Sequence, residues 1–320
     1  MNSGDAFNKT LTLSAALLTT VLVWAVFLVP GADLVWVTFT FLTSAMLFDV
    51  PDFKSRLTLA LKMAVYAAAA QFLTGITWQS PFLRIVLLSL FSFFVLKTVS
   101  HRQESCIILL VAFLTYSLPG GMIIVPDRCI DFGLSVFIIL LATSLCSIIR
   151  FPPAEKETAV FSHREAILIT AELMIGMLIT QLFRLSQGEW IMLTVIFIHM
   201  AVNARHSPGD LAVKRILSVP VGILLGGLYL GTLCRLDYRC VYLLPFTAAA
   251  AFFMLYSQDN YFLFSLLFMF SLTIFSDWLT GTYGRFHFMD VMLARSFSTL
   301  TGTLLLFAGE YNMQRKEKNI

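Results

Sequence analysis

The stretch EWIMLTVIFIHMAVNARHSPGDLAVKRILSVPVGILLGGLYLGT, residues 189–232, decides the fold. It consists of two apolar segments joined by a short polar turn, SPGD at residues 207–210, which interrupts the first segment and caps the second. The Lys214–Arg215 pair follows just inside the second segment, where a membrane helix would normally meet lipid. The stretch therefore predicts two membrane helices, the second of which carries positive charge into the membrane.

Arg215 opens a stripe of small residues on the second of these helices. At about 100° per residue, Val219, Gly222 and Gly226 follow Arg215 along one narrow side. Glycines at four-residue spacing let the backbone of another helix approach closely. We therefore expect Arg215 to face the interior of a helix bundle.

The same pattern recurs near the C-terminus in ARSFSTLTGTLL, residues 294–305. Arg295 precedes Gly302 by seven residues, which is the spacing between Arg215 and Gly222. The residue three places after each arginine is serine. We interpret the two segments as two copies of one helix motif, in which an arginine precedes small residues.

These segments carry a resemblance to a known family. The Trp-x-x-Leu-Thr-Val opening at residues 190–195, the polar turn and the arginine-led helix resemble the membrane region of the fusaric acid resistance and aromatic acid exporter superfamily. In that family the arginine is commonly followed by Gly-Thr and then Gly, and here Ser218–Val219 and Ser298–Thr299 occupy the Gly-Thr positions. The resemblance implies a helical membrane fold and export of organic acids.

The composition is that of a membrane protein. Of 320 residues, 58% are hydrophobic and only 13% are charged, a balance that leaves too little charge for the shell of a soluble protein of this size. The sequence contains no nucleotide-binding loop, metal-ligand cluster or nucleophile motif. We therefore expect no enzyme activity, no cofactor or metal, and no nucleic-acid partner.

A membrane-spanning helix needs about 20 apolar residues. On this criterion the chain is an all-α integral membrane protein with about twelve transmembrane helices. The expected spans cover residues 11–30, 33–49, 58–76, 82–98, 104–124, 130–150, 164–184, 188–204, 211–233, 240–256, 260–277 and 288–309. The spans at 33–49, 188–204 and 240–256 are short, and we expect them to be tilted or partly buried.

An internal repeat underlies these spans. LALK at residues 59–62 recurs as LAVK at 211–214, and Trp36 precedes the first as Trp190 precedes the second. The sequence therefore predicts two parallel six-helix repeats, related by an axis along the membrane normal. Residues 1–150 form the first repeat, 151–163 a cytoplasmic linker and 164–320 the second repeat. Neither repeat leaves room for the large cytoplasmic domains of many members of the resembled family.

Lysine and arginine are concentrated at the termini and in the turns that follow the even-numbered expected spans. Because positively charged loops tend to stay in the cytoplasm, this predicts that both termini are cytoplasmic. The resemblance places the chain in the inner membrane of a bacterium, surrounded by the lipid bilayer. It also implies a periplasmic adaptor, or membrane fusion, protein as partner. Assembly as a homo-oligomer stays open.

Glu172, His199, Arg215 and Arg295 are the ionisable residues that we expect to lie deep within spans, where charge is costly and marks a candidate functional site. Arg215 and Arg295, with Lys214 beside them, are the candidates for substrate binding, because a guanidinium group suits a carboxylate. Glu172 and His199 are the candidates for proton coupling. Histidine titrates near neutral pH, and burial can raise the pKa of a carboxyl group toward neutral pH. Alternatively, Glu172 forms a structural ion pair with one arginine, and His199 bonds a backbone carbonyl.

Three functions follow from these residues and the resemblance. The first is a proton-coupled efflux transporter of organic anions, namely aromatic or amphipathic carboxylic acids. The second is an arginine-lined anion channel, because the resembled superfamily is also similar to plant malate channels. The third, which the sequence favours least, is a membrane transferase that uses Asp49 and Asp52, whose DxxD spacing is typical of diphosphate-binding aspartates. A second such motif is missing, and a helix-end cap or a charge partner for Lys54 and Arg56 explains the pair better.

Overall fold

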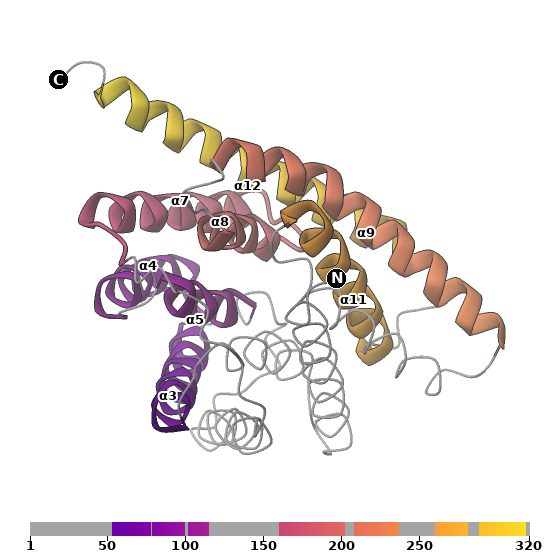
Figure 1. The fold of residues 1–320 in the computed structure, drawn as a ribbon, viewed down its shortest axis with the longest axis horizontal. Helices are drawn as coiled ribbons and strands as arrows, with labels where there is room; N and C mark the ends of the chain where they lie inside the picture. Colours follow the sequence, from indigo (N-terminus) through magenta and orange to yellow (C-terminus); the bar gives the residue numbers. More distant parts are fainter. Residues whose placement is uncertain are drawn as a thin grey trace, which may run out of the picture. The chain divides into compact units, whose positions relative to one another are not determined.

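The computed structural model describes residues 53–77, 79–99, 102–114, 160–201, 208–236, 260–280 and 288–317. These ranges contain helices and turns but no β-strand, which confirms the all-α class (Figure 1). Each helix coincides with one expected span. The helices are α3 (Phe53–Ile76), α4 (Pro81–Thr98), α5 (Arg102–Leu114), α7 (His163–Leu182), α8 (Glu189–Ala201), α9 (Pro208–Leu236), α11 (Tyr261–Thr280) and α12 (Phe288–Glu317).

Four of the described helices are long and apolar enough to cross a membrane. The qualifying segments are Leu57–Ile76, Pro81–Thr98, His163–Leu182 and Pro208–Tyr229. The architecture is therefore that of a helical membrane protein. The count of twelve spans and the two six-helix repeats also rest on residues outside the described ranges, so they stay predictions.

Helices α8, α9 and α12 differ from their expected spans in ways that bear on the site. Helix α8 has 13 residues, about 20 Å, which is shorter than the roughly 30 Å hydrocarbon core. Helix α9 continues to Leu236 and passes through Pro220, whose missing amide proton leaves the carbonyl four residues earlier without its helical bond. Helix α12 continues to Glu317, well beyond the expected end at residue 309, because its last turns are polar and need no lipid.

The described helices belong to two compact units, which we consider separately. The α11 unit contains α11, the first part of α3 to Tyr66, and the last part of α9 from Val221. The α8 unit contains α4, α5, α7, α8 and α12 from Met289, with the remaining parts of α3 and α9. Each compact unit combines separate stretches of the chain, whereas the predicted repeats at residues 1–150 and 164–320 are consecutive stretches. The division into repeats therefore stays a prediction.

Helix α8 is the centre of the α8 unit. Every residue from Glu189 to His199 is buried, and α5 and α7 pack directly against it. A helix that is apolar on all sides is stable only when protein surrounds it. Of the two expectations for the short span at 188–204, tilted or partly buried, this environment supports burial for residues 189–199.

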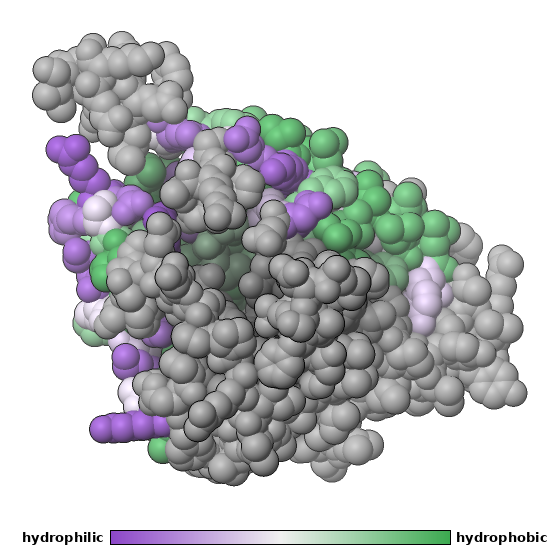
Figure 2. Space-filling model, in the orientation of Figure 1, coloured by the Kyte–Doolittle hydropathy of each residue, from purple (hydrophilic) through white to green (hydrophobic). Residues whose placement is uncertain are grey.

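The outer helices present apolar faces instead. The exposed large apolar side chains of each helix recur at three- and four-residue spacing and so lie on one side, as lipid contact requires. Figure 2 shows hydrophobic residues, in green, gathered at the surface over α9. On α9 this face consists of Val213, Leu217, Val221, Leu224, Leu225 and Leu228.

The opposite side of α9 carries the small-residue stripe, and in the α11 unit this stripe packs against α11. A Cβ atom at Gly222 would lie 2.5 Å from the carbonyl oxygen of Leu266, and one at Gly226 would lie 3.1 Å from that of Phe270. Because the contacts advance together along both chains, α9 and α11 run in the same direction here. The predicted close approach of a neighbouring backbone at these glycines is confirmed.

We expect Gly222→Ala to lower the stability of the folded protein. Alanine has a better helix propensity by about 1 kcal/mol, but the new methyl group would press on backbone atoms of α11 that cannot rotate away. Overpacking of this kind costs about 1–3 kcal/mol. The measurement is unfolding of the purified protein in mixed detergent micelles, with Leu225→Ala on the exposed face as control. An unchanged unfolding midpoint in Gly222→Ala would show that the helices are not in close contact.

Candidate functional site

The site is built on the hairpin of α7 and α8, whose turn is tight. Gly188 lies directly against the side chain of Thr180, and the Thr180 hydroxyl is 3.2 Å from the Gly188 carbonyl oxygen. Arg184 and Gln187 adopt positive φ angles of 47° and 63°, which non-glycine residues rarely do. Such strained positions cluster at functional sites, and Gln187 is the residue that reaches into this one.

Gln187 holds Arg295 and Trp190 together. Its side-chain oxygen Oε1 accepts a hydrogen bond from Nε of Arg295 at 2.9 Å and one from the indole Nε1 of Trp190 at 3.3 Å. The guanidinium carbon of Arg295 lies over the Trp190 ring, 5.2 Å from its centroid. Arg295 and Trp190 are 5% and 3% exposed, so this cationic contact is shielded from water. Glu189, the residue before Trp190, is also buried.

Arg215 on α9 is fully buried and contacts α8 further along that helix. Its Nε donates a long hydrogen bond of 3.4 Å to the hydroxyl of Thr194, and its guanidinium carbon is 4.4 Å from the centroid of the Phe197 ring. Cation–π contacts that are shielded from water contribute about 2 kcal/mol each. The expectation that Arg215 faces the bundle interior is confirmed.

Both arginines contact the same side of α8. Trp190, Thr194 and Phe197 are separated by four and three residues, so they form one stripe along the helix. The contacts of Arg295 and Arg215 follow one another along this stripe by one to two turns, about 6–10 Å. One side of α8 therefore carries aromatic and hydroxyl groups that contact two buried guanidinium groups from α9 and α12.

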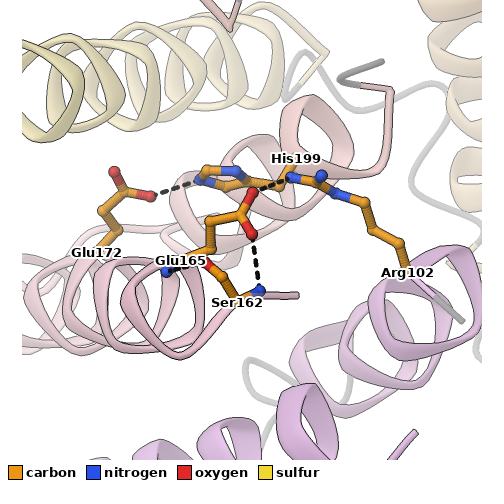
Figure 3. Close-up of polar contacts among 5 residues, drawn as sticks. All are labelled: Arg102, Ser162, Glu165, Glu172 and His199. Carbon is orange, nitrogen blue, oxygen red and sulfur yellow. Dashed lines mark hydrogen bonds and ion pairs between the residues drawn. The ribbon is translucent and has the colours of Figure 1, made fainter. Parts of the chain in front are cut away.

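Glu172 and His199 form the second buried polar feature (Figure 3). Oε2 of Glu172 on α7 is 2.8 Å from Nε2 of His199 on α8, and the residues are 4% and 7% exposed. On α8, His199 is nine residues from Trp190, which corresponds to about 14 Å along the axis and about 180° around it. The acid–imidazole pair is therefore on the opposite side of α8 from the arginines.

Helix α12 connects the two features. Arg295 is beside Trp190, a Cβ atom at Gly302 would lie 2.6 Å from the carbonyl oxygen of Ile191, and Gly309 lies against the Oε1 atom of Glu172. Helix α12 therefore runs parallel to α8 over about 21 Å, from the arginine end to the acid–imidazole end. The glycines are required because backbone meets backbone at Gly302 and backbone meets a carboxylate at Gly309.

An ion pair near the start of α7 fixes α5 to this hairpin. Nη2 of Arg102 is 3.1 Å from Oε1 of Glu165, and its guanidinium lies 4.4 Å from the centroid of the Phe161 ring. Glu165 and Ser162 also form a capping box at the N-terminus of α7. Figure 3 shows Glu165 and Glu172 on the same helix, the first paired with Arg102 and the second with His199. The Arg102–Glu165 pair is partly exposed, whereas the Glu172–His199 pair is buried.

The structure groups the predicted residues into two sets. It brings Glu172 to His199, and it brings Arg215 and Arg295 to one side of α8. The alternative of an ion pair between Glu172 and an arginine differs from the observed partner, which is an imidazole. Lys214 follows a different side of α9 from Arg215 and is only partly buried. Asp49 and Asp52 lie outside the described residues.

Several polar residues of the α8 unit were not predicted as site residues. Gln187 had no signal of its own, and Thr194 was read only as part of the motif at residues 190–195. Arg84 and Glu104, both buried in the α8 unit, show that the first half of the sequence also carries buried charge. Arg84 had a readable signal, since it is the fourth residue of the apolar segment PFLRIVLL.

Comparisons with protein-family models, curated proteins and solved structures found no match. The resemblance to the fusaric acid resistance and aromatic acid exporter superfamily therefore stays a prediction.

The arrangement suits two kinds of chemistry. Buried guanidinium groups create a positive potential that water does not screen, which favours an anion. A carboxyl hydrogen-bonded to an imidazole brings together two groups that can exchange a proton. Among the described residues no group of three or more His, Cys, Asp or Glu side chains could hold a metal ion.

We expect Gln187 and Arg295 to be energetically coupled. In a double-mutant cycle with Gln187→Leu and Arg295→Met, the loss of one hydrogen bond to a charged group predicts a coupling of about 1.5–3 kcal/mol in unfolding free energy. The cycle cancels the cost of placing leucine at a positive φ. A cycle of Gln187→Leu with Arg215→Met is the control and should be additive. Additivity in both cycles would contradict the observed contact.

Proposed function

We propose that this chain is a membrane transporter that exports organic anions, namely aromatic or amphipathic carboxylic acids, in exchange for protons. The observation that carries the proposal is the pairing of two buried features on one helix. Arg215 and Arg295 lie on one side of α8, and the acid–imidazole pair of Glu172 and His199 lies on the other. A passive pore needs no proton carrier, so the buried acid–imidazole pair favours coupled transport.

The arginines attract the anion in this proposal. A guanidinium group binds a carboxylate through charge-assisted hydrogen bonds, and these are strongest away from water. Trp190 and Phe197 lie beside the two guanidinium groups and offer flat apolar surface for an aromatic body. The combination selects for an organic acid over a small inorganic anion.

Glu172 and His199 carry the proton. Protonation of either residue changes the charge of the pair, and the position of α12 at Gly309 depends on the Glu172 side chain. Because Arg295 lies on the same helix, a shift of α12 would also move Arg295. The proton site and the anion site thus act on one element without touching each other.

The remaining expectations belong to this proposal as well. They are insertion in a bacterial inner membrane with both termini in the cytoplasm, and cooperation with a periplasmic adaptor protein. The relationship to the aromatic acid exporter superfamily and the absence of enzyme activity are part of the same proposal. Four membrane-length helices support a membrane location in general terms.

An anion channel is the second candidate, and one observation favours it. A channel should place arginines from both halves of the sequence around one path, and Arg84 from the first half is buried in the same unit as Arg215 and Arg295. Electrical recording separates a channel from a coupled transporter.

Purified protein in liposomes, with an imposed pH gradient and radiolabelled 4-hydroxybenzoate, tests the proposal. We expect accumulation against the concentration gradient that stops when a protonophore removes the pH gradient. Large currents that follow only the electrochemical gradient of the anion would establish the channel instead. A protein that moves no aromatic carboxylate under either condition would refute the proposal.

Glu172→Gln should uncouple the transporter. Glutamine keeps the shape and can still bond His199, but it cannot exchange a proton, so accumulation should fall to the level measured without a pH gradient. Glu165→Gln on the same helix is the control, because Glu165 pairs with Arg102 near the surface and should leave the gradient response in place. Unchanged gradient-driven accumulation in Glu172→Gln would exclude this residue as the proton carrier.

A further inference from the structure

The two arginine-led helices differ in the hydroxyl groups that surround the arginine. On α9 the hydroxyl of Ser218 donates to the carbonyl oxygen of Arg215 at 3.2 Å, so it is used within the helix. On α12 the corresponding neighbours of Arg295 are Ser298 and Thr299, each 1% exposed. At about 100° per residue both lie on the same side of α12 as Arg295, roughly one turn further on.

The hydroxyls of Ser298 and Thr299 behave unlike most other buried hydroxyls in the described helices. Oγ of Ser298 and Oγ1 of Thr299 are buried and make no hydrogen bond within the part of the chain that the structure describes. Many buried hydroxyls donate to the carbonyl four residues earlier, as in Thr74, Ser92, Thr180, Thr273 and Thr303. Among the described residues the hydroxyls of Ser89 and Thr170 are also buried without a hydrogen bond, but they are not adjacent to each other, and neither follows a buried arginine by three or four residues on its own helix. Two adjacent buried donors that bond neither backbone nor side chain are costly unless a ligand uses them.

The orientation of Arg295 also suits the binding of a ligand. Gln187 takes the Nε edge of the guanidinium, and Trp190 covers one face of it. The fork has five N–H donors in a fixed plane, so fixing its Nε edge also fixes the direction of its terminal nitrogens. Gln187 itself is only partly buried, in the turn at the end of the hairpin, so Arg295 is the more accessible of the two arginines.

We propose that Arg295, Ser298 and Thr299 form the contact set for the carboxylate of the transported organic anion, with Gln187 as a positioning residue. The guanidinium supplies the charge and the two hydroxyls donate hydrogen bonds to the carboxylate oxygens, while the ring of Trp190 flanks the apolar body. Arg215 contributes to the potential and to packing and makes no direct contact. This inference rests on the proposed function and names the residues of its binding site.

The test is equilibrium binding of radiolabelled 4-hydroxybenzoate to the full-length protein in lipid nanodiscs, with transport measured in parallel in liposomes. Each of Ser298→Ala and Thr299→Val should weaken binding by about 10- to 100-fold, the range for a lost hydrogen bond to a charged group. Thr299→Ser keeps the hydroxyl and should bind as the wild type does. Thr303→Val is the control, since its buried hydroxyl already bonds the Thr299 carbonyl oxygen at 2.9 Å.

Thermal unfolding of the same variants separates a ligand contact from a structural role. Removing a buried hydroxyl that bonds nothing should leave the unfolding temperature unchanged or raise it, so weaker binding with undiminished stability supports the site. If Ser298→Ala and Thr299→Val bind and transport like the wild type, the contact set is wrong and the proposed function still stands. If the wild type neither binds nor transports the probe, the proposed function and the contact set both fail.

Discussion

Two guanidinium groups buried beside one helix determine how the α8 unit is built. Moving an ion out of water costs several kcal/mol, and each aromatic contact offsets about 2 kcal/mol of this. Helix α8 supplies the aromatic contacts through Trp190 and Phe197 and a hydrogen-bonding hydroxyl through Thr194. It can do so only while protein surrounds it. A helix enclosed in this way does not need bilayer length, which accounts for its 13 residues.

One helix motif serves two packing environments. In α9 the glycines after Arg215 meet the backbone of α11, whereas in α12 the glycines after Arg295 meet α8 and the carboxylate of Glu172. The local pattern requires only that some helix comes close. Which helix comes close, and which polar groups it brings, makes the two arginines chemically different.

The separation of the two polar features has a consequence for mechanism under the proposed function. Anion and proton would bind on opposite sides of α8, about 14 Å apart along its axis, so direct charge transfer between them is not available. Helix α12 contacts both ends, through Arg295 and Gly309. A rigid helix that touches both sites is a physical means by which occupancy of one site biases the other.

The sequence by itself determined the helical membrane class, the segments that become the described helices, and the inward direction of Arg215 with its glycines. These features follow from apolar length and from the 3.6-residue period, which act within one segment. The partner of Glu172, the role of Gln187 and the burial of Glu104 were decided only by the tertiary structure. Gln187 and Arg295 are 108 residues apart. Contacts over such a separation depend on the rotation and register of packed helices, and the periodicity of a single segment does not encode them.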